Sequence, residues 1–128
     1  MTYIQMIYIM VRMAKTMREP TFWILTALAS QPLHGYGVLK EVSTLSEGRV
    51  TLQAGTLYAA LDRLTVEGLV EVDHDEIVDG RSRRYYRLAS DGVAALDAEA
   101  ARLRTNARTA RRQLSARLQQ GTLRGVTA

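Results

Sequence analysis

The dipeptide Asp79-Gly80 separates two short segments that have the composition of β-strands. In the segment before it, 69–74, Val70 and Val72 alternate with charged residues, and the segment after it, 82–88, combines tyrosines with arginines. An Asp-Gly pair between two such segments is a strong signal for a β-hairpin, because both residues tolerate the positive φ angles of a tight turn. This part of the chain is therefore expected to form an antiparallel hairpin.

The register of the hairpin is predicted from the requirement that its apolar side chains share one face, since a slip of one residue moves every side chain to the opposite face. A three-residue loop, Asp79-Gly80-Arg81, with Gly80 near the left-handed conformation, meets this requirement. It gives four cross-strand pairs: Val72 with Leu88, His74 with Tyr86, Glu76 with Arg84, and Asp73 with Arg87. The alternative, a two-residue turn at Asp79-Gly80, pairs Val72 with the charged Arg87.

Three short helices are predicted before the hairpin. They have apolar residues at helical spacing and end near a glycine or a proline, and they cover about 21–30, 34–45 and 54–67. In the third, Leu57, Leu61 and Leu64 form one stripe, and Gly68 follows as a stop. Three short helices with tight connections are typical of a helix-turn-helix. The expected fold class is mainly α with a small β-hairpin: a winged helix-turn-helix plus a long C-terminal dimerisation helix.

That long helix is predicted from Asp91-Gly92 onward. Seven apolar positions alternate three and four residues apart, as in a coiled coil: Val93, Leu96, Ala100, Leu103, Ala107, Ala110 and Leu114. This seam predicts a dimerisation helix over 91–119, and the alternative is a helix that folds back on its own domain. No acidic residue occurs beyond Glu99, and 120–128 is expected to be a frayed, flexible tail. The winged helix-turn-helix then occupies 17–90.

The segment 1–16 is an apolar N-terminal extension. Tyr3 to Val11 is almost wholly apolar but far shorter than the ~20 residues that span a bilayer, and no secretory signal is evident, so a membrane anchor is not favoured. All five methionines lie between Met1 and Met17. Two explanations are equally good. The start is over-long and Met17 is the natural first residue, or an extra helix covers an apolar surface, for instance across a dimer.

The composition of the 128 residues suits one domain and excludes several kinds of site. There are 17 basic and 13 acidic side chains, and the net charge of +4 suits an anionic partner. The absence of cysteine excludes disulfides, thiolate metal sites and cysteine nucleophiles, and it fits a cytoplasmic protein. A metal site at 73–76 is not favoured, because strand alternation points His74 away from Asp73 and Asp75. Neither an enzyme nor a cofactor is expected.

The start of the third helix, Gln53-Ala54-Gly55-Thr56, is small and uncharged. In a winged helix-turn-helix this end of the third helix enters the major groove of DNA, where a bulky residue at Ala54 or Gly55 would hold the helix away. Gln53 can read an adenine, Thr56 can contact a base or a phosphate, and the helix N–H groups favour a phosphate. The alternative is that Gln53-Ala54-Gly55 is only a tight turn and Thr56 only a helix cap.

Arginines gather at the predicted tip of the hairpin and just beyond it: Arg81, Arg83 and Arg84. A wing with this charge can straddle the minor groove and neutralise phosphates. The alternative role is cross-strand pairing with acids, at about 0.2–1 kcal/mol per pair, which does not exclude DNA contact. Arg81 and Arg83 are the better candidates, although the acidic strand before the turn weakens such a wing.

Short motifs follow one another in order from about residue 18 to 118. They are Phe22-Trp23-Ile24-Leu25-Thr26-Ala27-Leu28, Pro32-Leu33-His34-Gly35-Tyr36-Gly37, Gly55-Thr56-Leu57-Tyr58, Leu61, Leu64, Glu67-Gly68-Leu69-Val70, Gly80-Arg81, Arg84-Tyr85-Tyr86, Leu88 and Asp91-Gly92. Each is weak alone, but the ordered set resembles the PadR family of transcriptional regulators, in its short subfamily with one C-terminal helix. Two features depart from the family. Ala59 stands where proline is frequent, which leaves the helix straighter, and the first wing strand is acidic.

The resemblance implies a homodimer, held by the last helix, that binds a pseudo-palindromic operator in double-stranded DNA and usually represses transcription. It makes Tyr36 and Tyr58 candidates for phosphate contact, although packing beneath the recognition helix is the favoured role of Tyr58. His34 is a further candidate, with capping of the second helix as the favoured alternative. Arg63, on the third helix, completes the set of candidate DNA-contacting residues.

The resemblance also implies a response to small aromatic effectors, bound between the DNA-binding domain and the dimer helices. Trp23 is a candidate for lining such a pocket, but a lone tryptophan in a first helix is more often part of the core. The competing hypothesis for the whole chain is a winged-helix protein-interaction module that dimerises and does not bind DNA. Failure to form a DNA complex at low salt would favour this competitor.

Overall fold

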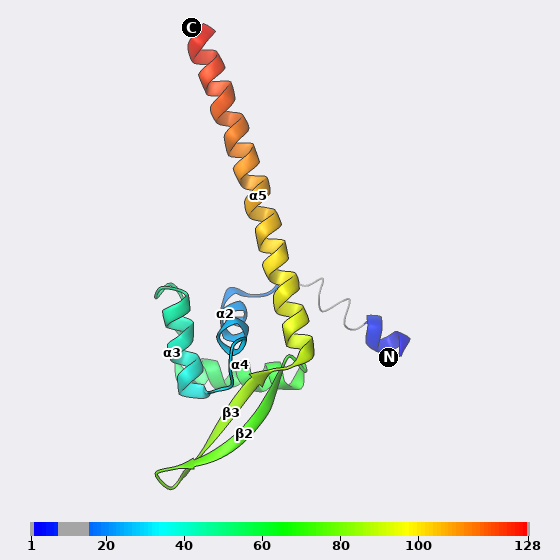
Figure 1. The fold of residues 1–128 in the computed structure, drawn as a ribbon, viewed down its shortest axis with the longest axis vertical. Helices are drawn as coiled ribbons and strands as arrows, with labels where there is room; N and C mark the ends of the chain where they lie inside the picture. Colours follow the sequence, from blue (N-terminus) through cyan, green and yellow to red (C-terminus); the bar gives the residue numbers. More distant parts are fainter. Residues whose placement is uncertain (1, 8–15, 128) are drawn as a thin grey trace.

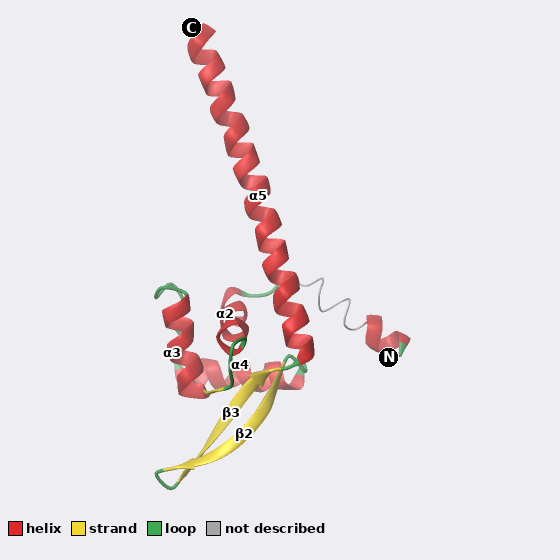
Figure 2. Ribbon diagram, viewed as in Figure 1, coloured by secondary structure: helices red, strands yellow, loops and turns green. Residues whose placement is uncertain are grey.

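The computed structural model describes residues 2–7 and 16–127 as helices and one small sheet (Figure 1, Figure 2). The elements in chain order are α2 (Glu19–Leu28), β1 (Leu33–His34), α3 (Gly35–Leu45), α4 (Ala54–Val66), β2 (Val70–Val78), β3 (Arg81–Leu88) and α5 (Ser90–Thr127). The expected fold class, mainly helical with a small antiparallel sheet, is confirmed. None of the helices in the described ranges combines the length and the apolar composition that crossing a membrane requires.

The hydrophobic core lies where α2, α3 and α4 meet. The predicted stripe of α4, Leu57, Leu61 and Leu64, is completely buried, as are Leu25 of α2 and Val38 of α3. Burial of one leucine side chain stabilises a fold by roughly 1.5–3 kcal/mol. The stripe therefore fixes α4 against the body of the domain and determines which face of that helix remains exposed.

The connection between α3 and α4 is held by Ser46. Its Oγ accepts a hydrogen bond from the N–H of Val50 at 3.0 Å and donates to the carbonyl of the same residue at 3.2 Å, and the side chain is completely buried. Between them the chain turns through Glu47 and Gly48, with φ of 56° and 77°. This closed loop sets the angle between the two helices of the helix-turn-helix.

The sheet contains a strand that the sequence did not reveal. Its order is β1-β3-β2, and the two residues of β1 pair antiparallel with β3, Leu33 opposite Tyr86 and His34 opposite Tyr85. A strand of two residues has no periodicity that could be recognised in the sequence. Its partner strand follows only after α3, α4 and β2, so the pairing depends on tertiary structure. It ties the start of α3 to the base of the wing.

The predicted three-residue loop of the hairpin is wrong. The turn contains only Asp79 and Gly80, whose φ angles of 51° and 75° both lie in the left-handed region, as a two-residue type I′ turn requires. Val78 therefore pairs with Arg81, and Glu76 faces Arg83 instead of Arg84. The Asp-Gly signal itself predicted the hairpin correctly.

A β-bulge lies between Val72 and His74. It allows the two-residue turn and still keeps the apolar side chains of the hairpin on one face. On the core side of the bulge Val70 pairs with Leu88 and Val72 with Tyr86, so the apolar residues do share one face, as predicted. The extra residue shifts the register by one, which a regular hairpin cannot do. The structure thus has both a tight turn at Asp79-Gly80 and a shared apolar face. The bulge that makes them compatible was not predicted.

The helix α5 leaves the domain as a long rod (Figure 1). It starts close against the sheet, where a Cβ at Gly92 would collide with the backbone carbonyl of Leu69. The sequence predicted that this helix ends at residue 119, but it runs to Thr127, since no proline interrupts it. At the other end of the chain, residues 3–7 form a short helical stretch with an exposed Tyr3 and Ile4. The two explanations of the extension fall mostly on residues 8–15, outside the described residues.

Candidate nucleic-acid interface

The first turn of α4 presents its small residues to solvent. Gln53 is the N-cap residue by its backbone angles, φ −81° and ψ 153°, but its side chain makes no capping hydrogen bond. Thr56 lies two residues inside the helix, so the alternative that it is the cap is wrong. Gln53, Ala54, Gly55 and Thr56 are all exposed. The N–H groups of this turn therefore have no side-chain partner and remain available to an external acceptor.

Gly55 has no role in packing. A Cβ built on it would meet nothing within 4 Å, and its φ lies outside the left-handed region. Glycine is unfavourable in a helix by roughly 0.5–1 kcal/mol relative to alanine. The fold alone therefore gives no reason for a glycine at the exposed tip of α4, whereas close approach of a bulky ligand does.

The three wing arginines differ in their surroundings. Arg84 donates to the Asp75 carboxylate at 3.0 and 3.5 Å, and not to Glu76 as the predicted register required. Among the ion pairs of the described residues, none involves Arg81 or Arg83. Arg87 does form an ion pair with Asp73, at 3.2 Å, but its partner across the strands is Glu71 and not Asp73 as the predicted register required. Arg81 and Arg83 are thus the wing arginines whose charge is not used in an ion pair, as favoured from the sequence.

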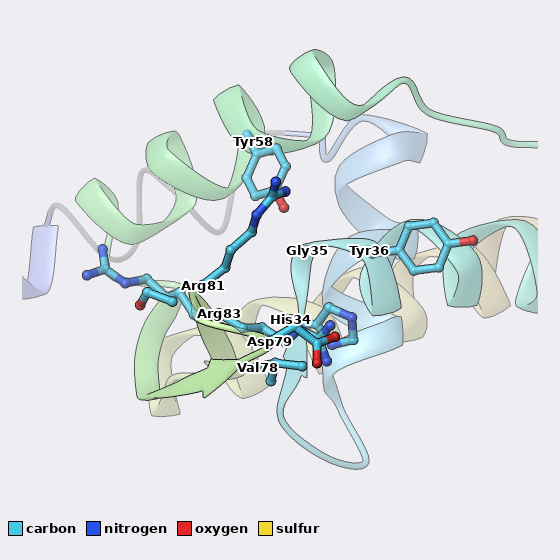
Figure 3. Close-up of a pocket in the computed structure, with 10 residues that line it drawn as sticks. His34, Gly35, Tyr36, Tyr58, Val78, Asp79, Arg81 and Arg83 are labelled. Atoms are coloured by element: carbon cyan, nitrogen blue, oxygen red, sulfur yellow. The ribbon is translucent and has the colours of Figure 1, made fainter.

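An open hollow of about 730 Å³ lies between the wing tip, the start of α3 and the exposed side of α4 (Figure 3). Its wall is about equally polar and apolar and comprises His34, Gly35, Tyr36, Tyr58, Val78, Asp79, Arg81, Ser82, Arg83 and Arg84. Six of the predicted DNA-contacting residues are in this set, although they come from four separate elements. The fold thus brings cationic guanidinium groups and the phenol of Tyr58 to one concave surface, which suits an anion, while the phenol of Tyr36 points away from them (Figure 3).

Tyr58 does not lie beneath α4, as was favoured from the sequence. It is 48% exposed and its ring lies across Gly35, where a Cβ would collide with the ring. Glycine at the first position of α3 therefore lets the two helices meet closely and directs the phenol into the hollow. Tyr36, one residue further on, is 70% exposed.

His34 occupies the N-cap position of α3, but its side chain makes no capping hydrogen bond, so the favoured capping role is wrong. Its ring instead stacks beside Tyr36, with centroids 6.4 Å apart, and meets the edge of Tyr85 at 5.4 Å. Partial burial, followed by the nearby Arg83 charge, lowers the pKa of His34, against the opposing effect of Glu76. A neutral imidazole at this place can accept or donate a hydrogen bond within the hollow.

His74 is held by two carboxylates at the base of the wing. The bulge puts Asp73 beside it, so the expectation that alternation separates the two is wrong: Nδ1 lies 2.5 Å from Asp73 and Nε2 lies 3.1 Å from Glu76. Its ring stacks on Tyr85, with centroids 4.5 Å apart. The described residues include no group of three or more side chains suited to hold a metal ion. The two carboxylate contacts and the stacked ring make His74 the centre of an ion-pair clasp beside the bulge.

The clasp predicts a pH dependence. The hydrogen bond with Asp73, followed by that with Glu76, raises the pKa of His74 above 6.5, and His74 in turn lowers the pKa of Asp73 and of Glu76 below 3.8 and 4.5. A raised histidine pKa stabilises the fold below 6.5, and this is lost as the pH rises through the raised value. Lowered carboxyl pKa values stabilise it above 4.5, and this is lost on acidification. The clasp therefore contributes most between these limits.

NMR titration of the His74 ring is the direct measurement. Its pKa is expected above 6.5 in the wild-type chain, and Asp73→Asn is expected to lower it more than Glu76→Gln, because the Asp73 hydrogen bond is the larger cause. His34, whose pKa is lowered, serves as the internal control in the same spectra. A His74 pKa at or below the ordinary value would contradict the clasp.

The candidate DNA-contacting residue Arg63 and the candidate effector-binding residue Trp23 both make contacts within the domain. Arg63 donates to the Thr21 hydroxyl at 3.1 Å and to Glu67 at 3.4 Å, so it joins α4 to α2 and is absent from the hollow. Trp23 packs against the core, as the more frequent role predicted, and its indole N–H donates to Glu19 at 3.3 Å. The contact of Arg63 with Thr21 was not visible in the sequence, because the two residues are 42 positions apart.

The predicted dimer seam is largely uncovered in the single chain. Leu96 packs against the domain core, but Val93, Leu103 and Leu114 are 56%, 42% and 60% exposed. The helix does not fold back on its own domain, which was the alternative (Figure 1). An apolar row of this length left in water is unfavourable, and a second copy of α5 would cover it.

A winged helix-turn-helix followed by one long helix is the arrangement of a known family. Residues 24–98, more than half of the chain, match the PadR-like family of transcriptional regulators. The chain belongs to this family. The predicted resemblance is therefore confirmed, and the match covers α2 to the start of α5, including every element that lines the hollow.

Two relatives of this PadR-family chain show how far the similarity extends. The transcriptional regulator Rv3488 of Mycobacterium tuberculosis is 41% identical over 73 residues, which are 57% of this chain and 64% of the relative. The uncharacterized protein X of Lysinibacillus sphaericus is 32% identical over 73 residues, 57% of this chain and 67% of that protein. The match with Rv3488 thus spans less than two thirds of that regulator.

Solved PadR structures have the same fold. A PadR family regulator from hypervirulent Clostridium difficile R20291 superposes with a TM-score of 0.62 at 23% identity, covering 73% of this chain and 96% of that one. Bacillus subtilis PadR in complex with operator DNA gives 0.57 at 23% identity, covering 63% and 46%. A PadR-like transcription factor from Bacteroides fragilis gives 0.61 at 25% identity, covering 85% and 94%. The similarity to the first two supports the fold alone.

Proposed function

We propose that this PadR-family chain is a sequence-specific DNA-binding transcriptional regulator that acts as a homodimeric repressor and is released by a small-molecule effector. The observation that carries the proposal is the hollow shared by α4 and the wing. There Arg81 and Arg83, which enter none of the ion pairs of the described residues, line the same hollow as Tyr58 of α4, and the exposed residues 53–56 lie just before Tyr58 along the chain. Such a regulator acts on chromosomal DNA, so we also propose a cytoplasmic location.

In the proposed complex the first turn of α4 enters the major groove. Gln53 and Thr56 are exposed there and carry the amide and hydroxyl groups that contact base edges, while Ala54 and Gly55 allow close approach. The wing arginines and the phenol of Tyr36 contact phosphates on either side. Support for this geometry comes from the fold shared with B. subtilis PadR, which was crystallised with operator DNA. Arg63, engaged with Thr21, is the least favoured of the candidate residues.

In the proposed homodimer two copies of α5 pair along Val93, Ala100, Leu103, Ala107, Ala110 and Leu114, with Leu96 shared with the domain core. The exposure of this row supports the pairing. Two recognition helices related by a twofold axis require a pseudo-palindromic operator, with half-sites about 34 Å or a multiple of that apart. Trp23, the candidate for an effector bound between the domain and α5, is partly buried and contacts Glu19 and Phe22.

The decisive experiment is an electrophoretic shift with the DNA upstream of the protein's own gene. We expect a complex whose affinity falls steeply with salt, and a dimer in sedimentation at the concentrations that bind. A dimer that shifts no duplex even at low salt would favour the protein-interaction module instead. A monomer that binds DNA would contradict the proposed role of α5 in dimerisation but not the proposed DNA binding.

The wing supplies a quantitative prediction. Removing one phosphate contact reduces the slope of log affinity against log salt by about 0.9. Because the proposed dimer carries two wings, Arg81→Ala/Arg83→Ala removes four such contacts and is expected to reduce the slope by roughly 3.6 and to weaken binding by about 10-fold or more near physiological salt. Salt titrations of operator binding measure both quantities.

The control is Arg87→Ala on the same strand. Arg87 donates to Glu71 at 2.8 Å and to Asp73 at 3.2 Å, so its charge is already compensated within the protein. We expect its removal to leave the salt slope unchanged. An equal decrease of slope in both variants would show that the wing acts only through net charge.

A further inference from the structure

The distal two thirds of α5 are exposed and basic. Every residue from 100 to 121 is exposed, whereas Ala95 and Leu96 near the helix start pack against the domain core. No aspartate or glutamate follows Glu99 anywhere in the chain. The whole helix has 38 residues and is therefore roughly 57 Å long. The seam explains one stripe of this rod, but it does not explain the charge.

Four arginines gather on one face of the rod: Arg104, Arg108, Arg111 and Arg112. Positions i, i+4, i+7 and i+8 lie on one side of a helix, and successive turns are about 5–6 Å apart along the axis. We call these four residues the arginine face. Arg102 is not part of it, because it pairs with the buried Glu99. In the described part of the chain no carboxylate pairs with any member, and Arg112 donates to the Thr109 hydroxyl, at 3.3 Å.

The chemistry of this face favours phosphate over a protein or lipid partner. Ala101, Thr105 and Ser115 lie beside the arginines, no aromatic side chain is among them, and the leucine in line with Arg104 and Arg111, Leu118, follows seven residues after Arg111. Protein interfaces depend on such apolar anchors, and membrane-bound helices need an apolar face. Guanidinium forks and hydroxyl groups are instead the donors that bind phosphate oxygens. The face lies beside the seam: Arg104 and Arg111 flank it, whereas Arg108 and Arg112 point further from it and stay exposed when two seams pair.

The arginine face cannot share the DNA segment that the wing would contact. The wing tip and the end of α5 lie at opposite ends of the molecule (Figure 1). The helix contains no proline, and it continues without a break from Ser90 to Thr127. A duplex bound by the arginine face is therefore not the segment at the wing of the same chain; it is a second duplex, or a distant stretch of the same molecule looped back.

We propose that the arginine face is a second, sequence-independent binding site for the phosphate backbone of double-stranded DNA, and that the dimer bridges two duplexes. The bridging part rests on the proposed operator binding by α4 and the wing. Binding at the arginine face does not depend on that function. DNA carries one charge per about 1.7 Å of axis, so a row of closely spaced guanidinium groups on a straight helix can follow its backbone and release counterions.

The test uses the full-length protein and two duplexes. An operator duplex on beads captures the protein, and a labelled duplex without the operator is then added. We expect the wild type to retain the labelled duplex. Arg104→Gln/Arg108→Gln/Arg111→Gln/Arg112→Gln should retain at least about 10-fold less, while its operator affinity at the bead falls by less than about 3-fold. The control is Arg18→Gln/Arg117→Gln, which removes two exposed arginines elsewhere, compared with each pair of arginine-face substitutions as well as with all four, and which should retain the duplex.

A second measurement separates this inference from the proposed function. Anisotropy of the labelled non-operator duplex is measured with Arg81→Ala/Arg83→Ala, in which the wing is disabled. Residual salt-dependent binding that disappears when the four glutamine substitutions are added supports the arginine face even if operator binding fails. Equal capture by the wild type and the four-glutamine variant overturns it. So does displacement of the duplex by poly-glutamate at the same charge concentration, which would indicate an acidic protein partner.

Discussion

Replacing Gly55 with leucine is expected to abolish operator binding while leaving the protein folded. The site is the second residue of α4, at the exposed tip that is proposed to enter the major groove, and a Cβ there meets nothing within 4 Å. The substitution therefore causes no clash within the protein, and it exchanges glycine for a better helix former. On the DNA side an isobutyl group would separate the helix from the base edges. We expect affinity to fall by at least about 100-fold, equivalent to roughly 2.7 kcal/mol.

The same chain supplies a matched control for this substitution. Gly121 is also a helical glycine with nothing within 4 Å of its Cβ position, but it lies far along α5. Gly121→Leu should fold equally well and bind the operator like the wild type at concentrations where the protein is dimeric; Gly121 lies seven residues after the seam position Leu114, so dimerisation is checked by sedimentation. Operator affinity and thermal unfolding are measured for both variants. Unchanged binding by Gly55→Leu would mean that this turn of α4 does not approach the DNA, which would remove the basis of the proposed docking.

Gly92→Ala is expected to have the largest effect on stability. Glycine to alanine within a helix ordinarily stabilises by roughly 0.5–1 kcal/mol. Here the sign is reversed, because the new methyl group would collide with the backbone carbonyl of Leu69 and with the side chain of Leu88. That carbonyl also accepts the N–H of Ala89 at 3.0 Å, so it cannot move without cost. Overpacking of this kind destabilises by about 1–3 kcal/mol, and backbone contact places this case near the upper value.

Thermal unfolding at a fixed protein concentration measures this effect, since a dimer makes the midpoint depend on concentration. We expect the midpoint to fall by several degrees in Gly92→Ala and to stay constant or rise slightly in Gly121→Ala, where the methyl group meets open space. Because Gly92 fixes the start of α5 against the sheet, the variant should also dimerise less well if the start of α5 is displaced. A midpoint equal to that of the wild type would show that α5 can shift at no cost in stability.

Local patterns in the sequence determined most of the architecture. The spacing of Leu57, Leu61 and Leu64 fixed the third helix and its buried stripe, and Asp79-Gly80 fixed the hairpin. The alternating seam fixed the long last helix, and the ordered motifs identified the PadR-like family. These predictions succeed because helical period, turn chemistry and motif order depend on residues that are close together in the chain.

Tertiary structure alone decided the details of the candidate site. The strand at Leu33–His34, the bulge beside Asp73 and the placement of Tyr58 across Gly35 all depend on residues far apart in the sequence. The same holds for the ion pairs of the arginines. The observed register differs from the predicted one by one residue, so Arg84 pairs with Asp75 and not with Glu76. The sequence named the residue types that meet in the hollow. Long-range packing determined which of these residues lie close together and which arginines form ion pairs, because it sets the strand register and the distances between helices.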